Sequence, residues 1–205
     1  FPIIVGGTPL YIDSIVNAYE LLPVPIDFEF RKLAEKSSLQ ELKAMLLQVK
    51  PDIHNKTDLE DRQRLLRAIE IAKYKKVNPN LLEKLKESKP LIKPKIIGID
   101  FEKEELARRI YKRLISRLEE GMIEEVEALH KNKGIEWAYL ESLGLEYKFT
   151  SMYLQGKIET KAEYIDTTFR HICKFAKRQK TWFRKMERNG VKIEWGKGSI
   201  DSFCF

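Results

Sequence analysis

The sequence contains few of the residues that build covalent or metal-bound frameworks. Cys173 and Cys204 are the only cysteines, and the three histidines, His54, His130 and His171, are scattered without metal-ligand spacing. A disulfide framework and a structural zinc site are therefore excluded, and no residue is predicted as a metal ligand. The sequence also has no apolar run of 18 residues and no secretory hydrophobic region. We expect a cytoplasmic protein in a reducing compartment, without contact to a membrane.

Charge is distributed unevenly along the chain. Of the 205 residues, 43% are hydrophobic, enough for a packed core, and the net charge is +7. Residues 31–95 carry 17 basic and 9 acidic residues, and residues 151–205 carry 12 and 6, whereas 1–30 and 96–150 are net acidic. Two separate basic blocks are typical of surfaces that face a polyanion, although solvated helical faces give the same count.

The chain opens on a short apolar run, Pro2-Ile3-Ile4-Val5, which ends in Gly6-Gly7-Thr8. A β-branched run without alternation predicts a strand buried on both faces of a parallel sheet. Ligands of such sheets bind beyond the carboxyl ends of the strands, where glycine allows close approach and the Thr8 hydroxyl would be presented. The alternative is a tight turn with Thr8 as a helix N-cap.

Helical spacing and capping signals predict an all-helical segment between two pieces of one core. Two capping boxes, Ser38–Glu41 and Thr57–Glu60, open helices over 39–49 and 57–76. The other predicted elements are helices over 8–20, 79–88, 103–131 and 160–188, and strands over 95–99 and 191–195. We therefore expect a core segment at 1–23, a helical insertion at 24–92 and the continuation of the core at 93–205.

Three arginines, Arg109, Arg113 and Arg117, recur at every fourth position of the predicted helix 103–131. Glu105 can neutralise Arg109, but Arg113 has arginines at both of its i±4 positions, an arrangement that favours an anion between them. Guanidinium groups bind phosphate bidentately, so a diphosphate is a suitable ligand. An ordinary basic helix face is the alternative.

The most specific local signal is the basic run near the C-terminus, CKFAKRQKTWFRKMER. Eight basic residues and one acid lie between Arg170 and Arg188, and Gln179 falls on the apolar stripe of the helix. An amide there is costly without partners, so we expect Gln179 to face an interior channel or to hold a neighbouring loop. A second candidate, Gln63 to Arg67, offers Gln and Arg on adjacent turns to bases or phosphates. The alternative is an exposed helix with a Glu60–Arg64 pair.

Four motifs in this order resemble the tRNA dimethylallyltransferase family (tRNA isopentenyltransferases). The stretches PIIVGGTPLY, DRQRLLRAIE, ELARRIYKRLISRLEEGMIEEVEAL and FAKRQKTWFR resemble its GGT strand, its DxQRxxRALE helix, its arginine helix and its AKRQxTWFR element. The resemblance implies an α/β fold. Its P-loop-type parallel-sheet core would be incomplete here, and an all-helical insertion domain would make the chain mostly helical. It also implies transfer of the dimethylallyl group of dimethylallyl diphosphate to N6 of the adenosine 3′ of the tRNA anticodon, with Mg²⁺ on the diphosphate.

The resemblance also implies roles for individual residues. Thr8 would be catalytic, near the amine of the flipped adenine, and Arg109 and Arg113 would bind the diphosphate. The residues implied to contact the anticodon stem-loop of tRNA are Gly7, Thr8, Gln63, Arg64, Arg67, Lys177, Arg178 and Gln179. We expect a monomer.

The sequence departs from the family pattern in three places. It contains no GxxxxGK[ST] phosphate loop; this loop and the catalytic Asp precede the GGT strand in the family, so we expect the chain alone to lack them and to be inactive. Residues 143–146 read Leu-Gly-Leu-Glu where the family usually carries Gly-Tyr, and Cys173 replaces a common Arg. Two other functions stay open: a non-catalytic RNA-binding module, and an adenylate isopentenyltransferase acting on free nucleotide, which needs no basic insertion.

Overall fold

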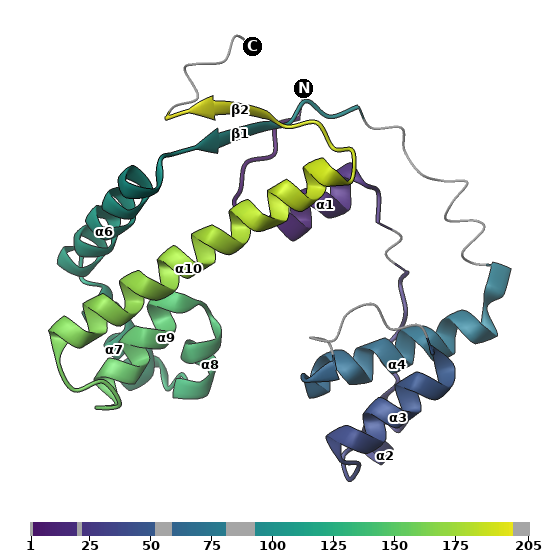
Figure 1. Cartoon of the computed structure of the whole chain (residues 1–205). Helices are drawn as coiled ribbons and strands as arrows, with labels where there is room; N and C mark the ends of the chain where they lie inside the picture. The colour runs from purple at the N-terminus through teal and green to yellow at the C-terminus, as the bar shows by residue number, and fades with distance from the viewer. Residues whose placement is uncertain (1, 20–21, 52–58, 81–92, 199–205) are drawn as a thin grey trace. The chain divides into compact units, whose positions relative to one another are not determined.

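The computed structural model describes residues 2–19, 22–51, 59–80 and 93–198 (Figure 1). The chain divides into two compact units, one of residues 1–13 with 94–205 and one of residues 14–93. The division falls within helix α1 (Pro9–Val16). Each unit is described separately below.

The 14–93 unit contains α2 (Phe28–Ala34), α3 (Leu39–Val49) and α4 (Arg62–Val77). The predicted capping box at the start of α3 is confirmed, because the Ser38 hydroxyl accepts from Glu41 N at 3.2 Å and the Glu41 carboxylate accepts from Ser38 N at 2.6 Å. α4 begins later than predicted, with Asp61 as its N-cap. The second predicted capping box begins at Thr57, and that residue and most of the predicted helix 79–88 lie outside the described residues.

The core of this unit is small and lies between α3 and α4, with α2 against it. Its buried hydrophobic residues are Phe30, Ala34, Leu42, Leu46, Leu65, Leu66 and Ile69. They recur at three- and four-residue intervals, which places them on one face of each helix. The buried Glu70 carboxylate follows Ile69 on the same helix and is bound by two arginines, Arg31 and Arg67.

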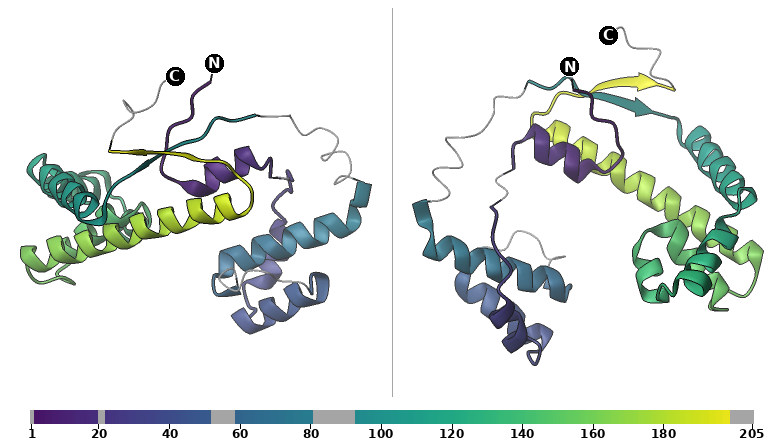
Figure 2. Two further views of the ribbon diagram at one scale, coloured as in Figure 1. Left: turned by 45° about the horizontal axis from the view of Figure 1, so that its top comes forward. Right: turned by 180° about the vertical axis from the view of Figure 1, so that it is seen from behind.

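The other unit combines a short parallel sheet with helices, as the predicted fold class requires. Strand β1 (Ile97–Asp100) pairs in parallel with β2 (Glu194–Lys197), with Ile97 opposite Glu194 and Asp100 opposite Lys197. Between them run α6 (Lys103–Glu119), α7 (Met122–Lys133), α8 (Trp137–Ser142), α9 (Leu145–Leu154) and α10 (Lys161–Arg188). The long helix α10 contacts α6 and α9 near its N-terminal end and returns the chain to the sheet (Figure 2).

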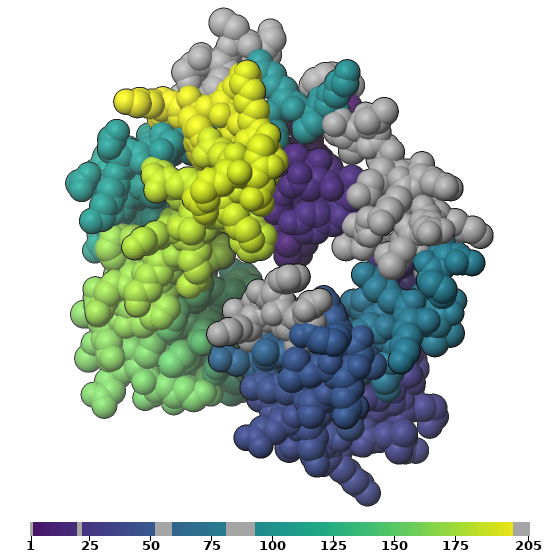
Figure 3. All heavy atoms as spheres, turned by 45° about the vertical axis from the view of Figure 1, so that its right-hand side comes forward, coloured from purple at the N-terminus to yellow at the C-terminus, as the bar shows by residue number. Residues whose placement is uncertain are grey.

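The N-terminal half of α10 is fixed by a core of aromatic side chains. Tyr164 is fully buried beside Phe149 and Ile158, and it stacks on Tyr153 with ring centroids 5.1 Å apart. Its hydroxyl forms a hydrogen bond of 2.6 Å with the Thr150 hydroxyl. Burial raises the pKa of Tyr164. The C-terminal half of α10 instead lies against α1, and the space-filling view shows the atoms of the two helices in contact (Figure 3).

Three sequence predictions need correction here. The run Pro2–Val5 is not a strand, and Ile3 and Val5 are 78% and 87% exposed. A strand needs a hydrogen-bonded neighbour, and in the described part of the chain β1 and β2 pair only with each other. The predicted helix 103–131 is two helices, because Gly121 adopts φ 93° between α6 and α7, a conformation that favours glycine. The predicted helix 8–20 ends at Val16, and Ala18 has φ 43°.

Candidate active site

The segment Gly6-Gly7-Thr8 forms an exposed loop directly before α1. Pro9 occupies the first helical position, where its missing N–H has no consequence, and the Thr8 carbonyl accepts from Tyr11 N at 3.2 Å. Gln179 of α10 donates a hydrogen bond from Nε2 to the Gly7 carbonyl oxygen. Of the two interpretations of Gln179, the structure therefore supports the second: its amide holds a neighbouring loop.

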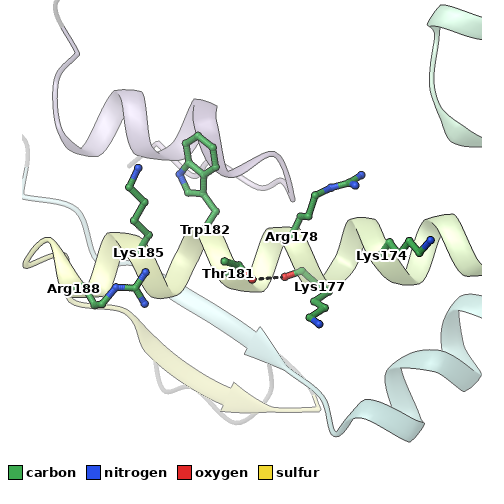
Figure 4. Close-up of a pocket in the computed structure, with 7 residues that line it drawn as sticks. All are labelled: Lys174, Lys177, Arg178, Thr181, Trp182, Lys185 and Arg188. Carbon is green, nitrogen blue, oxygen red and sulfur yellow. Dashed lines mark hydrogen bonds between the residues drawn. The ribbon is translucent and has the colours of Figure 1, made fainter. Parts of the chain in front are cut away.

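A basic groove follows the exposed face of the C-terminal half of α10 (Figure 4). Its volume is about 540 Å³. The residues that line it, called the α10 groove below, are Lys174, Lys177, Arg178, Thr181, Trp182, Lys185 and Arg188. Five of the seven are cations and none is an acid, so the α10 groove attracts anions. Thr181 is turned to its own helix, where its hydroxyl donates to the Lys177 carbonyl at 3.0 Å.

The same half of α10 is tied to two other parts of its unit. Trp182 Nε1 donates to Asp13 Oδ2 of α1 at 3.0 Å, and Asp13 is buried. Lys180 Nζ lies 2.6 and 2.8 Å from the two carboxylate oxygens of Asp100, the last residue of β1. The sequence does not indicate the pairs Trp182–Asp13 and Lys180–Asp100. The two residues of each pair are at least 80 positions apart, and neither pairing follows a helical or strand period. These contacts fix α10 against α1 and the sheet.

The predicted diphosphate arginines lie on α6 and differ in their partners. Arg109 pairs with Glu105 at 2.6 Å and lies over the Phe101 ring, 4.3 Å from its centroid. Hydrogen bonds from Arg108 and then Arg109 lower the pKa of Glu105. Arg113 is exposed and has no ion pair or hydrogen bond with any described residue.

Arg117, the third arginine of this face, lies 3.5 Å from both Glu120 and Glu125. The like-charge crowding expected at Arg113 is therefore weaker than the sequence predicts, since carboxylates neutralise both of its arginine neighbours. Arg113 keeps a guanidinium that is open to an anion from solvent.

The predicted RNA-contacting residues of α4 lie in the 14–93 unit and have different environments. Gln63 and Arg64 are exposed. Arg67 is half-buried, donates to the Val24 carbonyl at 2.8 Å and pairs with Glu70 at 3.1 Å. Arg67 thus has a structural role that the sequence did not indicate, because Val24 is 43 residues away.

Two of the three departures from the family pattern, Leu143–Glu146 and Cys173, lie in the described part of the chain. Tyr147 donates to Glu125 at 2.5 Å, and this bond is the main cause of the raised pKa of Tyr147. Gly144, just before α9, has φ 146°, which favours glycine in the Leu143–Glu146 segment. Burial raises the pKa of the Cys173 thiol, so it stays protonated at neutral pH and is a poor nucleophile.

No cluster of three histidine, cysteine or carboxylate side chains in the described ranges could hold a metal ion. A magnesium ion on a diphosphate is held chiefly by phosphate oxygens and water, and such a site needs no cluster of three protein ligands. None of the helices in the described part of the chain is long and apolar enough to cross a bilayer.

Comparison with known proteins identifies the family. The model of a family described as IPP transferase matches residues 1–186. The chain belongs to the IPP transferase family. A "tRNA dimethylallyltransferase 2" of Treponema denticola is 54% identical over 95% of this chain, and a "tRNA dimethylallyltransferase" of Treponema pallidum is 49% identical over 95%.

Solved structures of IPP transferases share the fold. A tRNA isopentenylpyrophosphate transferase of Bacillus halodurans is 26% identical over 94% of this chain and 59% of its own, with a TM-score of 0.52. A tRNA δ(2)-isopentenylpyrophosphate transferase of Staphylococcus epidermidis is 27% identical over 96% of this chain and 63% of its own, with a TM-score of 0.53. The expected fold class, a largely helical chain with part of a parallel-sheet core, is thereby confirmed. The chain spans 65% and 62% of the lengths of the two Treponema relatives.

Proposed function

We propose that this chain forms the larger part of a tRNA dimethylallyltransferase of the cytoplasm. The enzyme would transfer the dimethylallyl group of dimethylallyl diphosphate to N6 of the adenosine 3′ of the anticodon. The observation that carries the proposal is the junction of two motifs: the loop that presents Thr8 is bonded, through Gly7, to a helix whose neighbouring residues line a groove with five cations. The Thr8 hydroxyl beside the cationic α10 groove suits a reaction in which the nucleophile, the adenine N6, belongs to tRNA, which is a polyanion.

The proposed reaction is a substitution at the allylic carbon. The adenine N6 attacks C1 of the dimethylallyl group, the C1–O bond breaks with its electron pair leaving on the diphosphate, and N6 gives one proton to a general base, the role that the resemblance gives to the catalytic Asp of the family. In this chain the Thr8 hydroxyl would hydrogen-bond the amine and orient it. Arg113, and Arg109 after release from Glu105, would stabilise the charge on the departing diphosphate.

An adenine inside a stacked anticodon loop cannot reach the allylic carbon, so it must leave the stack. We propose that the α10 groove, with Lys177 and Arg178, binds the phosphates of the anticodon loop while Gln63 and Arg64 of α4 bind the stem-loop as a second surface. This assigns the helical segment 24–92 to tRNA binding and 1–23 with 93–205 to the core. We propose that the protein acts as a monomer, with Mg²⁺ bound to the diphosphate.

The two alternatives predict different ligands. A free-nucleotide transferase needs no extended cationic surface, so the α10 groove favours tRNA. A non-catalytic RNA-binding module would bind tRNA as tightly and transfer nothing.

The test uses the full-length gene product with labelled dimethylallyl diphosphate and either tRNA or AMP. We expect label in tRNA and not in AMP. Thr8→Ala should lower kcat at least 10-fold with little change in tRNA affinity, and Thr8→Ser, which keeps the hydroxyl, should restore most of it. Tight tRNA binding without label in tRNA would leave the RNA-binding module as the function.

A further inference from the structure

Two side chains of α10, one helical turn apart, hold the two ends of the segment that carries Thr8. Gln179 donates a hydrogen bond to the carbonyl of Gly7, the residue before Thr8. Trp182 donates a hydrogen bond to the carboxylate of Asp13, which follows Thr8 by about one and a half helical turns. Positions i and i+3 lie on the same face of a helix, so both side chains point to this segment. In Figure 4 the Trp182 indole extends from α10 toward α1.

The approach of Gln179 to the loop leaves little room beside one of the two glycines. A Cβ placed on Gly7 would lie 2.7 Å from Gln179 Nε2, whereas a Cβ on Gly6 would meet nothing within 4 Å. Neither glycine has the positive φ that favours glycine, so a larger residue at position 7 would affect the Gln179 amide and not the backbone conformation. The observed hydrogen bond therefore depends on glycine at position 7, because a Cβ there would displace the Gln179 amide.

Among the described residues, few other backbone hydrogen bonds fix the loop. Pro2–Val5 forms no strand, and within the described ranges the Thr8 carbonyl accepts from Tyr11 N, a bond between the loop and α1 themselves. A side chain that must meet a reacting atom has to be held closely, since a misplacement of about 1 Å costs on the order of 100-fold in rate.

We propose that Gln179 is a positioning residue: its amide fixes the Gly7 carbonyl and thereby sets the place of the Thr8 hydroxyl at the reacting amine, with Trp182 as the second support. The proposal rests on the proposed function, because it assigns Thr8 to the amine. Gln179 itself acts on the loop and not on the diphosphate, so its effect belongs in kcat and not in the KM for dimethylallyl diphosphate.

The first experiment measures the loop in the full-length gene product without any substrate. Gln179→Met keeps the length of the side chain and removes the donor. We expect the ¹⁵N order parameters of the Gly7 and Thr8 amides to fall in Gln179→Met and to stay unchanged in Arg170→Ala, a control at an exposed α10 position outside the groove. Unchanged order parameters in Gln179→Met would overturn the proposal, whatever the activity of the protein.

The second experiment is a double-mutant cycle in the full-length gene product. We expect Gln179→Met to lower kcat about 10- to 100-fold at unchanged KM for dimethylallyl diphosphate. In a Thr8→Ala background the same change should cost less than about 3-fold, because the hydroxyl it positions is gone. A full loss in that background would show that Gln179 acts independently of Thr8 and would refute the role. If the wild type transfers no dimethylallyl group, the proposed function fails, while the order parameters still decide whether Gln179 holds the loop.

Discussion

The buried carboxylate of Glu70 offers the sharpest test of the structure of the 14–93 unit. Only 3% of Glu70 is exposed, and its carboxylate accepts four hydrogen bonds. Arg31 donates two of them, at 2.6 and 3.1 Å, Arg67 donates one at 3.1 Å, and the backbone N–H of Asp27 donates one at 3.3 Å. Glu70 therefore joins α2, the segment before it and α4. The perturbation is Glu70→Gln, which keeps the shape and removes the charge.

The expected loss in the free energy of unfolding follows from the number of these hydrogen bonds and from the exposure of the side chains that donate them. Breaking a buried ion pair costs about 3–5 kcal/mol, and a hydrogen bond to a charged group contributes about 1.5–3 kcal/mol. The Arg31 and Arg67 side chains are 30% and 37% exposed, so water replaces part of what they lose. We expect Glu70→Gln to lower the free energy of unfolding by about 2–3 kcal/mol, which is about 10–20 °C in the Tm of a small unit.

The assay is thermal unfolding followed by circular dichroism at pH 7, with amide exchange to assign the transition to residues 14–93. Glu35→Gln is the matched control, because Glu35 is an exposed acid of the same unit. We expect it to change the Tm by less than 3 °C. A Glu70→Gln protein that melts with the wild type would refute the account of this network.

The pH dependence provides a second check on the same residue. The hydrogen bond from Arg31 is the main reason that the pKa of Glu70 lies below its usual value of 4.5. A carboxyl whose pKa is depressed by folding stabilises the protein above the unfolded pKa and loses that contribution as the pH falls through the folded pKa. The gap in stability between wild type and Glu70→Gln should thus be constant above about pH 5.5 and narrow below about pH 4.5. A gap that widens on acidification would contradict the assignment.

Three further outcomes test the site. Arg113→Ala in the full-length gene product should lower kcat/KM for dimethylallyl diphosphate by about 10- to 150-fold, the loss of one charge-assisted bidentate contact, while steady-state kinetics and a salt titration show tRNA binding nearly unchanged; weaker tRNA binding alone would assign α6 to the RNA surface. Arg64→Ala and Arg67→Ala should both weaken tRNA in a filter-binding assay, but Arg67→Ala should also lower the Tm, since Arg67 holds Glu70 and the Val24 carbonyl. The 205-residue chain by itself should bind tRNA in a gel-shift assay and transfer no label, because its sequence contains no GxxxxGK[ST] loop; measurable turnover would show that this loop is dispensable.

Local signals in the sequence were sufficient for the helices that have caps and one clear apolar stripe. The Ser38–Glu41 capping box fixed the start of α3, and the stripe of α10 predicted its span to within one residue at its start. These features depend on residues three or four apart, which the sequence displays directly. The sequence also predicted strands at 95–99 and 191–195, but their parallel pairing with each other is known only from the structure.

Features that depend on distant partners were not predictable in this way. The apolar run Pro2–Val5 has the composition of a strand, but strand formation depends on a neighbour that composition does not specify. Glu70 lies beside Ile69 on a buried helix face, and nothing in its local sequence names Arg31, 39 residues away, as the partner that permits its burial. In the same way, the sequence near Lys180 does not indicate that Asp100 is its partner.

For Gln179, the sequence predicts that the side chain needs a hydrogen-bond partner, and the structure shows which partner it has. The helical period placed its amide on the apolar stripe of α10, and the cost of an unpaired amide required a partner. The sequence could not decide between a channel and a loop, because that choice depends on what α10 packs against. The structure supplies the Gly7 carbonyl, and a Cβ on Gly7 would displace the Gln179 amide while a Cβ on Gly6 would lie in open space. Two motifs that the sequence shows only as separate stretches, GGT and AKRQ, are therefore parts of one contact, and the double-mutant cycle between Thr8 and Gln179 measures whether they are also parts of one function.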